Sequence, residues 1–503
     1  MNNLFSRHSI PGAIEYRIVE NNPWWHGKPS KAAPKMKRWP FKPILDNFEK
    51  KLVPVTLLRG PRRVGKTTLQ NQLIDYMLSN GLARPDEILH IQFDEFPDWK
   101  EFKSATKSPV LDIAYWFEEK ILKVPFNQLA RQNRVAYIFF DEVQNLPSWA
   151  EQIKSLVDHN DVRVLVTGSS ALHIGLGKES LAGRVSQIDI GPLRLSEISE
   201  MSDIALPPFA FAGGTNGLNK IEFWKDLAAH GKKLSKERDM VFKLFSDRGG
   251  YPAAQERLDI AWEDIARLLI DTVINRVIQH DLRLGEGKGK HKDPRLLEEV
   301  FRMCCRYSGQ YPAPLKLAEE IRRVYTGNIG TSRILYYLRF LDQAMLIKLV
   351  QPLELRLKRR KGYDKLCLCD HALRSAWLNE KIPLDSEGID ATPDYSQIAG
   401  HLIEGVIGYF LSDIAEITVN HYPERVREPE VDFIVTAGDV RIPVEIKYRR
   451  RIDAIEDTMG LKRFMEKADN RSCFGLLITR DDTEPDPDPR IVRMPASSLL
   501  LLR

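Results

Sequence analysis

Nine consecutive residues in the first fifth of the chain have the types and spacing that can hold a phosphate group. Glycines let the backbone curl so that its N–H groups point at phosphate oxygens, and the helix that follows adds partial positive charge. In the pattern Gly-x-x-x-x-Gly-Lys-[Ser/Thr], the lysine neutralises the β- and γ-phosphates and the hydroxyl binds Mg²⁺. We expect this P-loop to bind ATP with Mg²⁺, the alternative being a glycine turn beside a helix. The residues are Gly60, Pro61, Arg62, Arg63, Val64, Gly65, Lys66, Thr67 and Thr68.

Two adjacent acids, Asp141 and Glu142, end the apolar run 135–140. Beside a P-loop, the first acid of such a pair holds Mg²⁺ and the second orients and deprotonates the attacking water. We therefore expect Asp141 to act as a metal ligand and Glu142 as the general base of a hydrolase. The alternative is a strand that ends in two acids without a chemical role.

Two further residues are candidates for the same site. Ser169 follows the apolar run 162–167 and is expected to contact the γ-phosphate or its water, unless it only caps the next helix. Arg184, within the sequence Leu-Ala-Gly-Arg-Val at 181–185, is a candidate arginine finger that acts on a neighbouring subunit. A structural arginine at the surface is the alternative.

A second group of candidates lies near the C-terminus. Residues 431–436 and 440–448 are predicted to be paired strands, with Glu445 and Lys447 on one face and Asp432 opposite Val444 or Glu445, within about 5 Å. Two carboxylates and a lysine at that spacing can hold a divalent metal and activate water against a phosphodiester, with Asp432 and Glu445 as the metal ligands. This is the arrangement of the restriction-endonuclease-like fold, and Glu404 on a predicted helix resembles that fold's preceding acid. Solvent-facing polar strands, or the same fold without cleavage, stay open.

Between the two groups, residues 294–345 are predicted to form three short helices, followed by a basic hairpin. This order is that of a winged helix, and its third helix could lie in a DNA major groove while the hairpin contacts phosphates. We expect the leucines of the third helix to face inward and its other large side chains to offer outward or flanking polar tips. These residues are Arg333, Tyr336, Tyr337 and Arg339, and the basic residues of the hairpin are Arg356, Lys358, Arg359, Arg360 and Lys361. Use of this region for protein contact is the alternative.

The elements that must position these residues indicate an α/β protein of several domains. Apolar runs at 53–58, 88–93, 135–140 and 162–167 alternate with helix-length segments, which is typical of a parallel sheet covered on both faces. The expected domains are an N-terminal arm with a lead-in helix (1–50), a P-loop ATPase core (51–198), a helical lid or insert with a linker (199–293), a winged helix with a basic wing (294–380) and a restriction-endonuclease-like domain (397–503).

Composition limits the classes of function. The chain has 503 residues and a net charge of +5, from 74 Lys+Arg against 69 Asp+Glu, so any affinity for nucleic acid must come from local patches. Its five cysteines lack zinc-ligand spacing, which favours buried thiols in a reducing compartment. No apolar run approaches the roughly 20 residues of a membrane span, and the N-terminus lacks a secretory pattern. We expect a cytoplasmic protein without a membrane partner.

Taken together, the motifs resemble those of a prokaryotic family of AAA-type ATPases in which a winged helix and a restriction-endonuclease- or Holliday-junction-resolvase-like domain follow the ATPase. The resemblance rests on residues 60–68, 141–144, 167–170, 180–184, 191–197 and 249–252, and on Glu-Val-Asp-Phe and Pro-Val-Glu-Ile-Lys near the end. It implies a homo-oligomer, conceivably a ring, with Arg184 at a subunit interface. Two functions stay open: an ATP-driven DNA-processing enzyme for genome maintenance or defence, and a switch or translocase that binds DNA or proteins without cutting.

Overall fold

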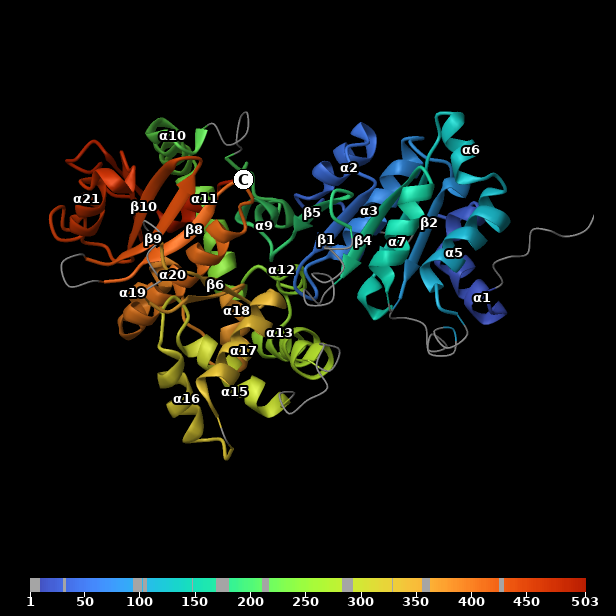
Figure 1. The fold of residues 1–503 in the computed structure, drawn as a ribbon. Coiled ribbons are helices and arrows are strands. Elements are labelled where there is room, and N and C mark those ends of the chain that lie inside the picture. Colours follow the sequence, from blue (N-terminus) through green and yellow to red (C-terminus); the bar gives the residue numbers. More distant parts are fainter. Residues whose placement is uncertain are drawn as a thin grey trace, which may run out of the picture. The chain divides into compact units, whose positions relative to one another are not determined.

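The computed structural model describes residues 10–29, 33–93, 102, 106–146, 148–168, 181–209, 217–282, 293–327, 329–354, 362–424 and 429–503 (Figure 1). The chain divides into two compact units, Met1–Ile190 and Gly191–Arg503. Each unit contains its own five-stranded β-sheet. Among the described residues, every helix is too short or too polar to cross a membrane.

The sheet of the first unit is parallel throughout, in the order β2-β3-β4-β1-β5. Its strands are β1 (Val55–Arg59), β2 (Ile88–Gln92), β3 (Ala136–Asp141), β4 (Val162–Gly168) and β5 (Val185–Asp189). The four strands predicted from the sequence are confirmed to within two residues at each end. Strand β5 was not predicted, because it is a half-buried edge strand without an apolar run.

Helices cover both faces of this sheet (Figure 1). On one face, Phe48 of α2 contacts Tyr137 and Phe139 of β3, with ring centroids 5.6 and 6.0 Å apart. On the other face, Ile138 and Phe140 belong to a buried cluster with residues of α5 and α7. The predicted α/β arrangement is therefore confirmed for this unit. Its helices are α1 (Gly12–Asn21), α2 (Phe41–Lys50), α3 (Lys66–Ser79), α5 (Pro109–Phe117), α6 (Phe126–Arg131) and α7 (Trp149–His159).

The second unit begins with a group of helices that pack against its C-terminal residues. Arg238 is buried and binds Asp482 (2.7 Å) and Ser498 (2.8 Å). Helices α10 and α11 contact α22. The boundary between the units thus groups residues 199–293, predicted to be a lid, with the C-terminal part of the chain. The helices are α9 (Leu195–Met201), α10 (Ile221–Lys233), α11 (Ser235–Arg248), α12 (Pro252–Gln255), α13 (Trp262–Leu269) and α22 (Ala496–Leu499).

Three helices and a β-hairpin follow in the predicted order. They are α15 (Pro294–Arg306), α16 (Pro314–Arg322) and α17 (Thr331–Gln343), then the antiparallel strands β6 (Ile347–Val350) and β7 (Lys365–Leu368). Asp293 caps α15, since its side chain accepts a hydrogen bond from Leu296 N. Helices α18 (His371–Leu378) and α19 (Ser386–Ala391) then lead into the last part of the chain.

The sheet of the second unit has the order β12-β11-β10-β9-β8. Strands β8, β9 and β10 are antiparallel neighbours, whereas β10, β11 and β12 are parallel. Along the chain the order is helix, three strands, helix, strand, strand. The elements are α20 (Ser396–Ser412), β8 (Thr418–Tyr422), β9 (Val431–Ala437), β10 (Val440–Lys447), α21 (Met459–Met465), β11 (Gly475–Thr479) and β12 (Ile491–Pro495).

Candidate functional sites

The predicted P-loop joins β1 to α3, with the lysine as the first residue of the helix. Gly65 is the residue before α3 and has φ = 95°, a left-handed conformation that favours glycine. The ammonium of Lys66 is nearly buried and donates to Gly60 O (2.9 Å) and Pro61 O (2.7 Å). The lysine is thereby held over the loop, with its charge inside the curve of the backbone.

Asp141 ends β3 and is fully buried between two hydroxyl groups. Thr67 Oγ1 donates to its Oδ2 (2.5 Å), and the Thr167 hydroxyl, at the end of β4, donates to its Oδ1. Burial, and after it the charge of Glu142, raises the pKa of Asp141 to about 6. The parallel strands bring these residues to one edge of the sheet. A buried carboxylate beside a hydroxyl is an all-oxygen donor set that fits Mg²⁺.

Glu142 adopts a left-handed backbone conformation, with φ = 53°, which is uncommon for a residue other than glycine, asparagine or aspartate. Its carboxylate accepts a hydrogen bond from the side-chain amide of Gln144. Its backbone N–H donates to Thr167 Oγ1 (3.4 Å). Glu142 thus adjoins the Asp141 site, and Gln144, which the sequence reasoning did not assign, is in contact with the candidate base.

The N-terminal segment before α2 contacts the P-loop, which the sequence did not predict. The Arg38 guanidinium donates to Val64 O, inside the loop. Gln72 of α3 donates to Pro34 O and Met36 O, both at 2.7 Å. This segment is rich in lysine, tryptophan and proline, but composition alone carried no signal for the contact.

The two remaining candidates for this site have different outcomes. Arg184 precedes β5, its side chain is 36% exposed, and it forms an ion pair with Asp158 of α7. The hydrogen bond from Arg184 lowers the pKa of Asp158. Ser169 lies outside the described residues, so its predicted contact with the γ-phosphate stays a prediction.

The C-terminal candidates lie together in the second unit. Strands β9 and β10 pair up to Phe433 opposite Val444, and Asp432 and Glu445 are the next residues along the two strands. Lys447 Nζ lies 2.6 Å from Glu445 Oε1, so these two side chains share a face. Glu404 is half-buried on α20. We call Glu404, Glu430, Asp432 and Glu445 the acid cluster.

A lysine from the hairpin β6–β7 lies within the acid cluster. Lys365 Nζ is 3.2 Å from Glu404 Oε2, 3.2 Å from Asp432 Oδ1 and 4.0 Å from Glu430 Oε1, and its side chain is 1% exposed. The sequence reasoning missed Lys365, because a single lysine beside a basic wing gives no local sign of burial among acids.

The acid cluster in this arrangement does not fit a metal ion. Among the described residues, no group of three or more His, Cys, Asp or Glu side chains could hold one. Lys365 binds Glu404 and Asp432, and the second oxygen of Asp432 accepts a hydrogen bond from Ile446 N (2.8 Å). Burial, and then the charge of Asp432, raises the pKa of Glu445 to about 8. The predicted metal ligation by Asp432 and Glu445 thus requires a different arrangement.

Among the described residues of the candidate DNA-binding region, Tyr337 differs from expectation. It was predicted to offer an outward or flanking polar tip on α17, but it is buried, and its hydroxyl accepts a hydrogen bond from Asp293 N (2.9 Å). Tyr336 and Arg339 are exposed, and Arg333 is half-buried beside Asp293. The predicted wing residues Arg356, Lys358, Arg359, Arg360 and Lys361 lie outside the described residues.

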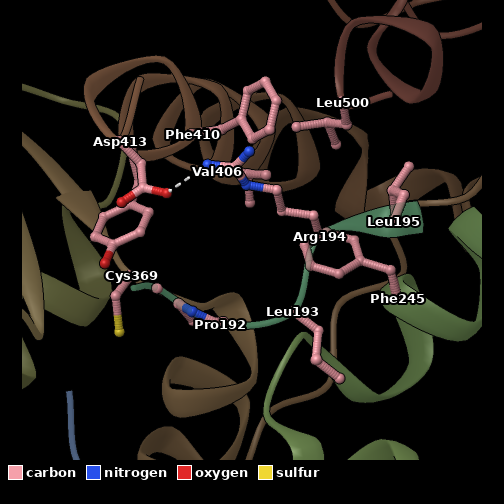
Figure 2. Close-up of a pocket in the computed structure, with 12 residues that line it drawn as sticks. Pro192, Leu193, Arg194, Leu195, Phe245, Cys369, Val406, Phe410, Asp413 and Leu500 are labelled. Carbon is pink, nitrogen blue, oxygen red and sulfur yellow. Dashed lines mark hydrogen bonds and ion pairs between the residues drawn. The ribbon is translucent and has the colours of Figure 1, made fainter. Parts of the chain in front are cut away.

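Residues 191–197 and 249–252, two of the motifs behind the family resemblance, are in contact in the second unit. Leu193 N donates to Gly250 O (2.6 Å), and Gly250 N donates to Asp370 Oδ2 (2.6 Å). Figure 2 shows the mostly apolar pocket beside this contact, where Arg194 reaches Asp413, the residue after α20. The pocket has a volume of about 60 Å³, and the two side chains are 3.2 Å apart. Residues 191–197 and 249–252 therefore have a structural role, fixing the segment that follows β5 to α20 and to Asp370.

Comparisons with known proteins bear on the two units differently. Residues 53–199 match the sequence model of an AAA domain family, and residues 243–382 match a domain of unknown function, DUF8612. An uncharacterised protein of Haemophilus influenzae is 24% identical over 337 residues, 65% of this chain and 70% of that protein. One of Methanocaldococcus jannaschii is 24% identical over 261 residues, 52% of this chain but only about half (48%) of its own length.

Two solved structures are similar to parts of the chain. A Walker-type ATPase of Pyrococcus abyssi has 15% identity and a TM-score of 0.40, covering 69% of this chain and 99% of that one. C. elegans PCH-2 has 17% identity and a TM-score of 0.27, covering 46% and 61%. The AAA match spans the P-loop, Asp141 and Glu142 together with all five strands of the first sheet. Residues 53–199 are thus an AAA-type P-loop ATPase domain.

Proposed function

We propose that this protein is a Mg²⁺-dependent ATPase that acts on DNA, with ATP hydrolysis driving or gating the work of its C-terminal part. The observation that carries the proposal is the buried Asp141, which binds the hydroxyls of Thr67 and Thr167 beside the P-loop lysine. In the described contacts, no lysine or arginine lies within hydrogen-bonding distance of this carboxylate. A bound cation would therefore stabilise its buried negative charge.

In this proposal each residue of the site has a separate task. Lys66 and the P-loop N–H groups hold the phosphates, while Thr67 and Asp141 hold Mg²⁺. Bound Mg²⁺ would neutralise the charge that develops on the transferred phosphoryl group. Glu142 orients the attacking water and accepts its proton. Arg184 of a neighbouring subunit of a cytoplasmic homo-oligomer, conceivably a ring, would stabilise the same charge.

The case for DNA rests on the second unit. The order of α15, α16, α17 and β6–β7 is that of a winged helix, with Tyr336 and Arg339 exposed on its third helix. The order of α20, three strands, α21 and β11 supports a restriction-endonuclease-like domain. Asp432 and Glu445 directly follow the last pair of β9 and β10, and Lys447 contacts Glu445. Cleavage of a phosphodiester by this domain would require the acid cluster to be free of Lys365.

A second candidate is a switch or translocase ATPase that binds DNA or a protein partner and does not cut. The observation in its favour is the contact of Lys365 with Glu404 and Asp432, which neutralises two of the acids that cleavage would need. The two candidates share the ATPase chemistry and differ in whether the C-terminal part cuts DNA or only binds DNA or a protein.

The ATPase part is tested by two substitutions in the full chain. Lys66→Ala should abolish tight nucleotide binding, whereas Glu142→Gln should bind nucleotide but hydrolyse it about 100-fold more slowly or worse, because general-base catalysis is lost. Nucleotide binding is followed by fluorescence titration and turnover by phosphate release. Normal turnover by Glu142→Gln would show that Glu142 is not the base.

The DNA part is tested with plasmid, branched and single-stranded DNA plus Mg²⁺, with and without ATP. Stimulation of phosphate release by DNA is expected, and it should disappear in Lys66→Ala. Cleavage that is lost in Asp432→Ala/Glu445→Ala would favour the first candidate, and stimulation without cleavage the second. Phosphate release that DNA leaves unchanged, with no binding to any of these DNAs, would contradict the first candidate and the DNA-binding form of the second.

A further inference from the structure

The ammonium of Lys365 is enclosed by acids from different elements. Glu404 comes from the middle of α20, Asp432 from the second position of β9, and Glu430 from just before β9, while Lys365 itself begins β7. Its side chain is 1% exposed, and its Nζ also lies 4.8 Å from the centre of the Phe433 ring. The hairpin β6–β7 thus places one positive charge inside the C-terminal sheet's acidic site.

Burial of this charge is stable only because the acids surround it. An isolated ammonium in a low-dielectric interior loses its hydration without compensation and would release its proton. Burial alone would lower the pKa of Lys365, but the charges of Asp432, Glu404 and Glu430 outweigh that effect and hold it well above its ordinary value. The three carboxylates therefore favour the charged form of Lys365.

Without Lys365, the arrangement of acids around its ammonium would suit a divalent cation. Carboxylates that converge from separate elements on one point make a metal site when the point is free. Here two of them lie at hydrogen-bonding distance from an ammonium. The fourth acid, Glu445, has one oxygen paired with Lys447, while its buried Oε2 has no hydrogen-bond partner among the described residues.

We propose that Lys365 is the built-in cation of the acid cluster: its ammonium occupies the place of a divalent metal ion, so the cluster takes up metal only when Lys365 is removed or withdrawn. The inference rests on the proposed function in treating these acids as a nuclease-like site. It adds an autoinhibitory contact between the β6–β7 hairpin and that site.

The test is Mn²⁺ binding to the full chain without nucleotide or DNA, measured by the loss of the free-ion signal in electron paramagnetic resonance. Lys365→Met removes the charge and keeps the length of the side chain. Lys348→Met is the matched control, since Lys348 is exposed on β6 of the same hairpin, opposite Cys367. Lys365→Met should gain one Mn²⁺ site at least about tenfold tighter than any in wild type, and Lys348→Met should gain none.

A second substitution assigns the new site. In Lys365→Met/Asp432→Asn the added Mn²⁺ binding should be lost. Mn²⁺ should also raise the thermal midpoint of Lys365→Met more than that of wild type or of Lys365→Met/Asp432→Asn, because the extra site adds to the stabilisation. Equal Mn²⁺ binding by Lys365→Met and wild type would overturn the proposal.

If Lys365→Met does not fold, the proposal is tested with Lys365 in place. The proposal requires that Asp432→Asn, made in the wild-type background, leave Mn²⁺ binding unchanged, because the cluster holds no metal while Lys365 is present. Loss of a Mn²⁺ site in that variant would overturn the proposal. DNA is absent throughout, so failure of DNA cleavage would contradict the nuclease part of the proposed function without affecting this result.

Discussion

At the scale of single residues, Asp141 and Lys365 are both buried and charged, and their partners determine what each can do. Asp141 is hydrogen-bonded to two neutral hydroxyls and has a raised pKa, so its site favours a cation. Lys365 has two carboxylates at 3.2 Å and a third at 4.0 Å, so its site already contains one. We therefore expect the Asp141 site to bind an added divalent metal ion and the acid cluster around Lys365 not to bind one.

The buried His421 makes the stability of the fold depend on pH. It is fully buried, its Nε2–H donates to Tyr363 O (2.8 Å), and its Nδ1 has no hydrogen-bond partner among the described residues. Burial, followed by the charge of Lys365, lowers the pKa of His421 to about 4. Because this folded pKa lies below the unfolded value near 6.5, the stability from neutral His421 is complete above pH 6.5 and is lost as pH falls towards 4.

We therefore expect wild type to lose about 2 kcal/mol between pH 7.5 and pH 5 through His421 alone. His421→Gln keeps a donor for Tyr363 O but cannot be protonated, so its thermal midpoint should fall less than that of wild type over this range. The comparison is made by calorimetry at both pH values. An equal fall in the two proteins would show that His421 does not contribute to the acid sensitivity.

At the scale of elements, the sequence predicted the strands and motifs that show a local pattern. It did not predict the features that depend on contacts between residues far apart in the chain. Four strands of the first sheet, the P-loop and the acids after β3 follow from apolar runs and motif spacing. Strand β5 lacks such a run, and Tyr337 faces inward because its hydroxyl binds the backbone of Asp293, 44 residues earlier. The contacts of Arg38 with the P-loop and of Lys365 with Glu404 likewise exist only after folding.

The start of the P-loop offers a prediction at this scale. A Cβ added to Gly60 would collide with the backbone oxygen of Ile190, and this backbone is fixed because Ile190 N donates to Arg59 O (2.7 Å). Gly60→Ala should therefore displace the loop and weaken nucleotide binding about tenfold or more, measured by fluorescence titration.

Gly81→Ala is the matched control for Gly60→Ala. Gly81 follows α3 and has φ = 65°, but an added Cβ would meet nothing within 4 Å. Backbone strain should lower its thermal midpoint slightly and leave nucleotide affinity unchanged. If Gly60→Ala also binds nucleotide normally, the contact with Ile190 does not position the loop.

At the scale of the whole molecule, sequence and structure agree more closely for the ATPase domain than for the rest. The P-loop is contiguous and Asp141 and Glu142 directly follow an apolar run, so local sequence marks both parts of this site although Thr67 and Asp141 are 74 residues apart. The acid cluster draws on α20 and the β9–β10 hairpin, and Lys365 joins it from β7. Lys365 and Asp432 are 67 residues apart, and no spacing rule links them.

Assembly is the last property at this scale, and Arg184 is the residue that tests it. In this single chain Arg184 pairs with Asp158 and is 36% exposed. If it acts in a neighbouring subunit's site, Arg184→Ala should lower ATP turnover by about 1000-fold or more while sparing nucleotide binding. Asp158→Ala, which removes only the partner within the chain, should keep most of the turnover.

Mixing two inactive variants separates action between subunits from action within one. Glu142→Gln lacks the base but retains Arg184, and Arg184→Ala retains Glu142. In a mixed oligomer, the nucleotide site of an Arg184→Ala subunit can receive the arginine of a Glu142→Gln neighbour, so phosphate release should recover partly on mixing. Recovery should rise with the fraction of mixed contacts and vanish on dilution. If size-exclusion chromatography shows mixed oligomers but the mixture stays as inactive as its components, Arg184 does not act on a neighbouring subunit. Its role then lies within its own chain, where it forms the ion pair with Asp158.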